Sequence, residues 1–205
     1  MAEKNQNTPD FITNLVNLAL PEQGAAIISV SDDFFAPAKR MLSPQDPVFI
    51  PGRFDAHGKW MDGWESRRKR TTGHDYCVIR ICPGVVKAIE IDTSHFTGNY
   101  PSAAMLEACS ADIEPDENTT WTELVPKTGL EGDSQKIFTI NDKNTWSFIR
   151  LNIYPDGGIA RLRVYGEPAV ETSSFDRGQW VDLVSTNAGG VAVECNNMHF
   201  GDMSN

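Results

Sequence analysis

The stretch that decides the fold is residues 146–166, WSFIRLNIYPDGGIARLRVYG. Apolar residues alternate with polar ones from Ile149 to Ile153, and again from Ala160 to Val164. Side chains on a β-strand point to its two faces in turn, so this period of two predicts two strands, each with one buried face. The Pro-Asp-Gly-Gly segment between them favours a turn. The stretch therefore predicts a half-buried antiparallel hairpin.

Further strand-like segments precede this stretch. Residues 25–31, 77–82 and 85–91 are apolar and partly β-branched. Pro83 and Gly84 predict a turn between the last two segments. Short strands joined by many turns predict an all-β fold, an antiparallel β-sandwich. A chain of 205 residues is long enough for one such domain with extensions.

One helix is expected, within an N-terminal helical extension that covers residues 1–22. Thr8 can cap a helix, proline is favoured at the first helical position, and Pro21 ends the apolar pattern. A helical period places four apolar residues on one face. These are Phe11, Leu15, Leu18 and Ala19.

A weak internal repeat divides the chain. TNLVNLALPEQGAAIISVSDDFF near the start is echoed by VDLVSTNAGGVAVECNNMHFGD near the end. Gly24 aligns with Gly190 at an offset of 166 residues (190 − 24). Periodic self-similarity of this kind indicates a repeated structural unit. We therefore expect a first domain over residues 23–170, and a linker with the truncated start of a second repeat over residues 171–205.

Net charge limits the possible partners. The formal charge is −10, which disfavours binding to nucleic acid or to an anionic membrane surface. No apolar run approaches the roughly 20 residues that span a bilayer, and no secretory signal pattern is present at the N-terminus. Residues 110–136 are acidic and turn-rich, which is typical of a long surface connection. These observations favour a cytoplasmic protein.

The cysteines predict no special chemistry. Cys77 and Cys82 bracket one predicted strand, and at a separation of five their side chains face opposite sides. They therefore cannot share a metal ion or a disulfide. We expect them, with Cys109 and Cys195, to be buried free thiols.

The segment PGRFDAHGKWMDGWESRRKRTTGHD, residues 51–75, concentrates side chains that are costly to place in a loop. Its basic run at residues 67–70 is open to three interpretations: a solvated turn, a polyanion patch or part of an active site. The run is short and the chain is acidic, so a nucleic-acid patch is the weakest of these. Trp60 and Trp64 argue against a bare solvated turn. Arginine suits an anionic substrate because its planar fork binds both oxygens of a carboxylate.

Acid and base candidates flank predicted strands. His74 and Asp75 follow the basic run, and Asp92 and His95 follow the strand at 85–91. Histidine beside carboxylates suits proton transfer near neutral pH. The spacings match no specific metal-binding motif. No cofactor is therefore predicted. Histidine and aspartate can bind a divalent metal ion, but no motif in the sequence supports a metal site.

Asp32, in the segment SDDFF at residues 31–35, has two interpretations. It follows a predicted strand, so it is a candidate for acid-base chemistry or for binding a cation. Serine and aspartate are also common in turns and at helix N-caps, and this plainer interpretation is favoured by the segment alone.

Four segments together resemble the allantoicase family: SDDFFAPAKRML, PGRFDAHGKWMDGWESRRKRTTGHDYCVIRI, IEIDTSHFTGNYP and IYPDGGIARLRVYG. The resemblance covers roughly residues 11–170. It implies two tandem jelly-roll β-sandwiches similar to galactose-binding domains. It also implies homo-oligomers and a hydrolase that converts allantoate and water to ureidoglycolate and urea.

The resemblance and the chemistry of allantoate together suggest roles for ten residues. The substrate is an anion with two ureido groups, so its site needs a cation and groups that transfer protons. The hypothesis assigns proton transfer to His74, Asp92 or His95, and the orientation of these groups to Glu65 and Asp75. Arg67 or Arg68 would bind the carboxylate, and Asn99 would form a hydrogen bond to a ureido group. Trp64 and Asp32 would make further contacts to the substrate.

Two alternatives compete with this hypothesis. The first is a non-catalytic sandwich that binds carbohydrate through loop aromatics such as Trp60 and Trp64, since a fold alone does not determine function. The second is an inactive half-enzyme whose site requires groups from both repeats.

Overall fold

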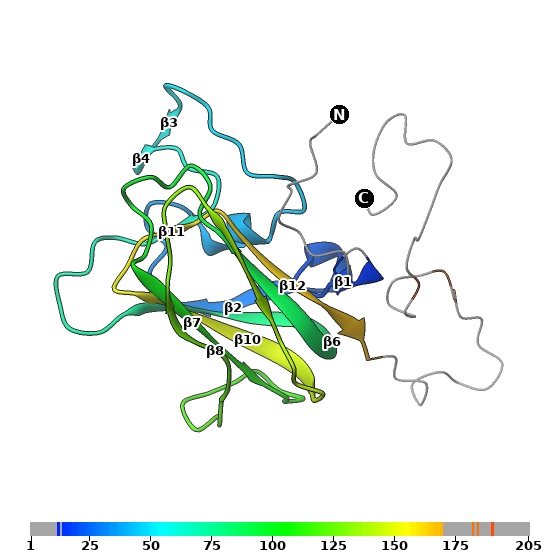
Figure 1. Ribbon diagram of the computed structural model, residues 1–205. Helices are drawn as coiled ribbons and strands as arrows, with labels where there is room; N and C mark the ends of the chain where they lie inside the picture. The colour runs from blue at the N-terminus through cyan, green and yellow to red at the C-terminus, as the bar shows by residue number, and fades with distance from the viewer. Residues whose placement is uncertain (1–11, 13, 170–181, 183, 185–189, 191–205) are drawn as a thin grey trace, which may run out of the picture.

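The computed structural model describes residues 12, 14–169, 182, 184 and 190, and Figure 1 shows its arrangement. The strands are β1 (Val16–Asn17), β2 (Ala26–Val30), β3 (Phe54–Asp55), β4 (Gly58–Lys59), β5 (Trp64–Glu65), β6 (Asp75–Asp92), β7 (Ala103–Cys109), β8 (Thr122–Gly129), β9 (Gln135–Thr139), β10 (Thr145–Tyr154), β11 (Gly158–Ile159) and β12 (Arg161–Pro168). Two short 3-10 helices, η2 (Pro21–Gln23) and η3 (Ala38–Leu42), lie between the first strands. All strand pairs are antiparallel, so the predicted all-β antiparallel class is confirmed.

Strand β6 organises the fold because it pairs with strands on both sides along its whole length. Its first part lies between β2 and β10, and β10 continues to β7 and β8. Its second part lies between β12 and β9, and β12 continues to β1. Both ends of β6 reach one connection, because Asp75 N–H donates to the Pro155 carbonyl and Ala160 N–H donates to the Asp92 carbonyl. β6 is therefore sharply bent between its ends.

The predicted turn at Pro83 and Gly84 is wrong in form, because β6 continues through both residues. Residues 81–83 lie opposite the single residue Ser147 of β10, so the register shifts here through a bulge larger than the usual two residues against one. Proline has no N–H to donate to a neighbouring strand, and a bulge is a position in a sheet that tolerates this loss. The Pro-Gly pair thus marks the bend of one strand instead of a break between two.

The predicted hairpin is wrong in its pairing, although both of its strands exist. β10 and β12 each pair with β6 and not with each other. The apolar residues of both strands are buried in the main core, as their alternation predicts. Two of the alternating polar residues are buried as well, Asn152 at 2% exposure and Arg161 at 1%.

The predicted N-terminal helix is wrong over the residues that the structure describes. Val16 and Asn17 pair with Tyr165 and Gly166 of β12, and the Leu18 carbonyl accepts a hydrogen bond from Cys82 N–H. The apolar spacing that predicted a helical face instead reflects burial of Leu18 against the sheet. Residues 1–11 of the expected helix lie outside the described part.

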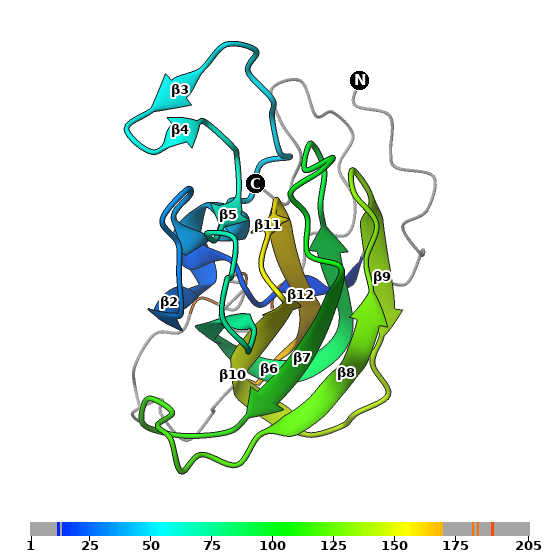
Figure 2. The same ribbon diagram turned by 90° about the vertical axis from the view of Figure 1, so that its left-hand side faces the viewer.

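Figures 1 and 2 show that the two ends of the sandwich differ. One end, which we call the loop-bearing end, carries the β3–β4 hairpin, β5, β11 and the connection between β10 and β12. The opposite end carries the loop that joins β7 to β8. The predicted second repeat, residues 171–205, lies almost entirely outside the described residues.

Two further findings concern sequence expectations. Cys77, Cys82 and Cys109 are free and buried, as predicted, and Cys195 lies outside the described part. Among the residues that the structure describes, no helix is long and apolar enough to cross a membrane.

Replacing Gly158 with alanine tests how closely the end that carries β11 is packed. An added Cβ at Gly158 would overlap the ring of Phe96, which is fully buried, whereas one at Gly98 would meet no atom within 4 Å. We expect Gly158→Ala to lower the free energy of unfolding by about 1–3 kcal/mol, and Gly98→Ala to change it little. Urea denaturation measures both. Equal effects of the two substitutions would contradict this packing.

Candidate active site

The connection between β10 and β12 holds two loops together. Ser66 N–H donates to the Gly157 carbonyl at 3.1 Å, and Gly157 N–H donates back to Ser66 Oγ at 3.2 Å. Gly158 N–H donates to the Asn99 carbonyl at 2.7 Å. Gly157 has a φ of 139°, and a Cβ there would lie 2.5 Å from the backbone nitrogen of Pro101, so only glycine fits this position. Segments 64–70 and 99–101 are thereby fixed side by side.

Glu65 and Asn99 form the first contact that this arrangement creates. Glu65 lies on β5, which pairs with β11, and Asn99 Nδ2 donates to Glu65 Oε1 at 2.7 Å. Burial raises the pKa of Glu65, and the Asn99 hydrogen bond and the charge of Lys59 oppose that rise only in part. Glu65 Oε2 has no hydrogen-bond partner within the described part of the chain. A carboxyl group in this setting is suited to act as a general acid.

Asp32 and Arg67 form a second contact beside it. Arg67 N–H donates to Asp32 Oδ1 at 2.8 Å, and its guanidinium lies 2.6 Å from Asp32 Oδ2. Burial alone would raise the pKa of Asp32, but the backbone and side-chain hydrogen bonds from Arg67 outweigh it and lower the pKa. The guanidinium of Arg67 is therefore already engaged by a carboxylate. Trp64 is fully buried, and its Nε1 donates to the Asp32 carbonyl at 2.8 Å.

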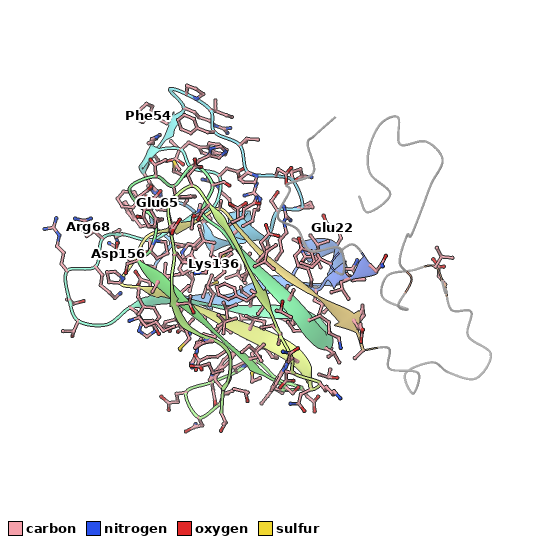
Figure 3. The ribbon with its side chains drawn as sticks, in the orientation of Figure 1. Glu22, Phe54, Glu65, Arg68, Lys136 and Asp156 are labelled. Carbon is pink, nitrogen blue, oxygen red and sulfur yellow. The ribbon has the colours of Figure 1, made fainter. Side chains whose placement is uncertain are left out.

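Arg68 is the exposed cation next to these residues. Figure 3 shows its side chain extending away from the body of the domain, on the same side as Glu65 and Asp156. It has no ion pair, hydrogen bond or ring contact with any other described residue. Between the two predicted carboxylate-binding arginines, Arg68 is therefore the one whose guanidinium is free.

Asp75 is placed in a buried ion pair. Lys69 Nζ lies 2.6 Å from Asp75 Oδ1, and Ser31 Oγ donates to the same oxygen at 2.9 Å. Asp75 is 1% exposed, and its Oδ2 is buried with no hydrogen-bond partner among the described residues. Lys69 N–H also donates to Asp156 Oδ2, which joins the basic run to the β10–β12 connection. These contacts indicate that Asp75 orders the loop at 66–75.

His74 belongs to a different network. Its Nε2 is 3.0 Å from Asn152 Oδ1, and its ring lies against Tyr154. Asn152 in turn donates to Glu107, which is paired with Arg150. Arg150 and Asn152 alternate with the core residues Ile149, Leu151 and Ile153, so they lie on the face of the sheet away from the main core, and Asn152 is nonetheless only 2% exposed there. We call this group the outer-face network. No contact joins His74 to Glu65 or Asn99.

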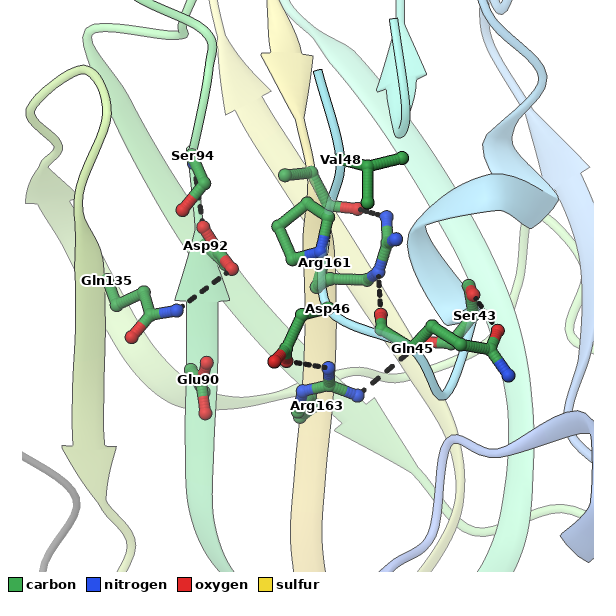
Figure 4. A network of polar contacts seen from close by, with 12 residues as sticks. Ser43, Gln45, Asp46, Val48, Glu90, Asp92, Ser94, Gln135, Arg161 and Arg163 are labelled. Carbon is green, nitrogen blue, oxygen red and sulfur yellow. Dashed lines mark hydrogen bonds and ion pairs between the residues drawn. The ribbon is translucent and has the colours of Figure 1, made fainter. Parts of the chain in front are cut away.

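Asp92 and His95 are also held by hydrogen bonds. Asp92 accepts from Ser94 N–H at 2.7 Å and from Gln135 Nε2 at 3.2 Å (Figure 4). His95 Nε2 lies 3.1 Å from the Pro47 carbonyl, and His95 N–H donates to Asp133. His95 has a φ of 68°, which is uncommon outside glycine. The structure thus distributes the predicted site residues over several networks, and the one that contains His74 and Asn152 is separate from the Glu65–Asn99 contact.

Two residues of this end were missed by the sequence analysis. His57 stacks on Phe34 at 4.5 Å, and Phe34 also lies under the guanidinium of Arg67. Arg161 is buried and pairs with Asp62 at 2.7 Å. Figure 4 shows Arg161 near Arg163, with Gln45 beside it. The alternation in β12 placed Arg161 on a solvent face, and only the packing of residues 40–62 over that face shows its burial.

No group of three or more histidine, cysteine, aspartate or glutamate side chains within the described residues is arranged to hold a metal ion. The acidic and basic groups of this end are instead linked to one another by hydrogen bonds and ion pairs.

The fold and the loop-borne site define the class: an antiparallel β-sandwich with polar groups gathered at one end. The family 32 carbohydrate-binding module of Streptococcus pneumoniae EndoD is similar in fold, with a TM-score of 0.50 and 16% identity over 74% of this chain and 100% of the module. The model of the Allantoicase repeat family matches residues 16–169. The chain belongs to the Allantoicase repeat family.

Two relatives agree with this assignment. "Probable allantoicase 1" of Burkholderia mallei is 53% identical over 201 residues, which cover 97% of this chain and 60% of the relative. The allantoicase structure from Saccharomyces cerevisiae has a TM-score of 0.78 and 28% identity, and the match covers 93% of this chain and 58% of that one. The chain thus spans about 60% of the length of the curated relatives it matches.

Replacing Asp32 with asparagine tests the Asp32–Arg67 pair. Because the folded pKa of Asp32 is lowered, the pair stabilises the fold above the unfolded pKa, and this stability is lost as pH falls through the folded pKa. Arg67 is 63% exposed, which limits the effect to about 1 kcal/mol or less. Between about pH 5 and pH 2, Asp32→Asn should therefore lose less free energy of unfolding than the wild type. Urea denaturation at each pH measures this, and parallel curves would contradict it.

Proposed function

We propose that this chain carries an active site of an allantoicase, in which allantoate and water give ureidoglycolate and urea. The observation that supports this most is the Glu65–Asn99 contact, because it holds a half-buried acid of raised pKa on the loop that also carries Arg68, whose guanidinium has no partner among the described residues. Membership of the Allantoicase repeat family and the names of the relatives support the choice of substrate.

The proposed reaction breaks a C–N bond at the tetrahedral carbon that bears both ureido groups. Glu65 Oε2 donates a proton to the departing ureido nitrogen, while the other ureido nitrogen supplies its electron pair to the central carbon. Urea leaves, and water adds to the resulting imine-like intermediate as it loses a proton to a base. Ureidoglycolate is the product. Each step conserves atoms and charge without an external oxidant or reductant.

The other residues divide into binding and positioning roles. Arg68 binds the substrate carboxylate, and Asn99 both orients Glu65 and contacts a ureido group. Asp32, Arg67 and Trp64 hold the loop that carries Glu65. Fixing reacting groups in this way lowers the barrier by removing entropy before the reaction.

Three residues were assigned proton transfer in the hypothesis, and their contacts favour one of them: the three are His95, Asp92 and His74. His95 is the preferred base because its ring uses one nitrogen for the Pro47 carbonyl and keeps the other available. Both oxygens of Asp92 accept hydrogen bonds. His74 lies in the outer-face network. Asp75 orders the loop through Lys69.

The carbohydrate-binding alternative receives little support from the aromatic residues. Trp64 is fully buried, and Arg53 lies over the ring of Trp60 at 4.0 Å. Trp64 therefore offers no face on which a sugar could stack, and one face of Trp60 is already covered.

The domain organisation also remains a proposal. We infer that residues 23–170 form a jelly-roll unit, that residues 171–205 begin a second repeat, and that the protein is a cytoplasmic homo-oligomer. The internal repeat at an offset of 166 residues supports the second of these statements.

Replacing Glu65 with glutamine removes the proton without changing the size of the side chain. We expect kcat for urea release from allantoate to fall by about 10²–10⁴-fold, because the general acid is lost. The matched control is Glu114→Gln, an exposed glutamate on the loop between β7 and β8, which should leave kcat unchanged. An unchanged kcat for Glu65→Gln would remove Glu65 from the mechanism.

The pH dependence of urea release tests whether Asn99 acts through Glu65 or has only a structural role. Activity needs protonated Glu65, so it is lost as pH rises through the raised pKa of Glu65. The Asn99 hydrogen bond lowers that pKa, so Asn99→Ala should move the alkaline limb of the profile to higher pH. An unshifted limb would show that Asn99 does not act through Glu65.

Replacing Arg68 with alanine tests carboxylate binding. We expect kcat/KM for allantoate to fall by about 10–100-fold, with partial recovery in Arg68→Lys, which keeps the charge but not the planar fork. Arg70→Ala is the control, because Arg70 is an exposed cation of the same basic run. Equal effects at positions 68 and 70 would indicate general attraction of the anion instead of a specific contact.

The wild-type chain must be assayed alongside these variants. Urea release supports the proposal directly. Calorimetric binding of allantoate without urea release would favour the half-enzyme alternative. If the chain neither binds allantoate nor releases urea, the proposal is contradicted.

A further inference from the structure

The β3–β4 hairpin lies at the same end of the domain as β5, the strand that carries Glu65 (Figure 2). Glu65 forms an antiparallel bridge with Ala36, in which Glu65 N–H donates to the Ala36 carbonyl at 3.0 Å. Two residues before Ala36, the ring of Phe34 stacks on His57, in the turn between β3 and β4, with 4.5 Å between the ring centroids. The guanidinium of Arg67 lies 5.1 Å from the same Phe34 ring. The turn of the hairpin is therefore next to the strand that carries Glu65 and the loop that follows it.

The base of the hairpin is fixed to η3. Asp55 of β3 is paired with Arg40 of η3 at 3.7 Å. Arg40 Nη1 also donates to the carbonyl of Met61, which follows β4 and is 4% exposed, at 2.9 Å. Trp60 N–H donates to the Arg53 carbonyl at 3.0 Å, which closes the hairpin. The side chains of β4 are thus presented from a backbone that is held in place.

Lys59 of β4 is the cation that this arrangement brings near Glu65. Its Nζ lies 4.5 Å from the centroid of the Phe49 ring, which holds the ammonium without neutralising it. Burial raises the pKa of Glu65, and the charge of Lys59 opposes that rise, which requires the two groups to lie close together. Lys59 has no ion-pair partner in the part of the chain that the structure describes. Its ammonium is therefore near Glu65 and still open to a ligand.

The other charged or titratable side chains on the segments around Glu65 are paired, stacked or directed elsewhere. They are Arg67, paired with Asp32; Arg40, paired with Asp55; Asp156, which accepts a hydrogen bond from Lys69 N–H; His57, stacked on Phe34; and Arg68, which extends away from the body of the domain. Lys59 is thus the contribution of the hairpin to the charge around Glu65.

Lys59 is placed to meet one particular part of the substrate. In the proposed reaction Glu65 Oε2 protonates the departing ureido nitrogen, so this ureido group lies beside Glu65. The carbonyl oxygen of the group is carried by the carbon next to that nitrogen. A cation close to Glu65 is therefore close to this oxygen as well, whereas the carboxylate of the substrate is bound by Arg68.

We propose that Lys59 binds the carbonyl oxygen of the departing ureido group and stabilises the negative charge that develops there, an inference that rests on the proposed function. As the C–N bond breaks, its electron pair passes to the departing nitrogen and is shared with the adjacent carbonyl oxygen. Glu65 delivers its proton to that nitrogen and becomes a carboxylate. Lys59 keeps its own proton, and its charge stabilises both the oxygen and the new carboxylate.

Replacing Lys59 with methionine removes the charge and keeps a side chain of similar length. At a pH where Glu65 is protonated, kcat for urea release from allantoate should fall about tenfold or more. The alkaline limb of the pH profile should at the same time move to higher pH, because the charge that lowers the pKa of Glu65 is gone. Lys59→Arg keeps the charge, so it should recover most of kcat and the position of the limb. A merely structural role of Lys59 would not move the limb.

Arg53→Met is the matched control, because Arg53 is an exposed cation of the same hairpin whose guanidinium lies on the ring of Trp60. It should leave kcat and the limb unchanged, and equal effects at positions 53 and 59 would overturn the inference. Carbon-13 NMR titration of the Glu65 carboxyl gives a readout without turnover: its pKa should rise in Lys59→Met and not in Arg53→Met. A wild type that releases urea, with kcat unchanged in Lys59→Met, would overturn this inference and leave the proposed function standing. A wild type that releases no urea would overturn both.

Discussion

The structure depends on the backbone hydrogen bonds that the β10–β12 connection makes to its neighbours. Gly157 and Gly158 exchange these bonds with Ser66 and Asn99, which come from different parts of the chain. These bonds extend the pairing of β5 with β11 and bring the segment that carries Asn99 next to Glu65. The same connection ends two strands that both pair with β6. Fold and candidate site therefore share one constraint, and the glycines are required where the backbones approach most closely.

The alternation of apolar residues in residues 146–166 was enough to predict both strands and the core they form. It could not predict their partners, because alternation records which face is buried and not which strand lies beside it. β10 and β12 follow each other closely in sequence, yet a bent β6 separates them. The N-terminal prediction failed for a similar reason: the spacing around Leu18 fits a helix, but burial against the sheet produces the same apolar pattern.

The candidate site was predictable in its residue types and only partly in its geometry. An anion-binding arginine and an acid could be expected from the segment at 51–75. The Glu65–Asn99 contact joins residues 34 positions apart, and the Asp32–Arg67 contact joins residues 35 apart, so both depend on tertiary structure. Tertiary structure also decides which arginine is available, since Asp32 engages Arg67 and leaves Arg68 free. Burial, which raises the pKa of Glu65, is likewise a property of the folded end.

The most direct test of this account is a crystal structure of the chain with bound allantoate. The account predicts the carboxylate of allantoate on Arg68, and a ureido nitrogen within hydrogen-bond distance of Glu65 Oε2. Its second ureido group should lie near Asn99. Allantoate bound instead against the outer-face network of His74 and Asn152, or bound without contact to Glu65, would contradict the central claim that the loop-bearing end is the site of catalysis.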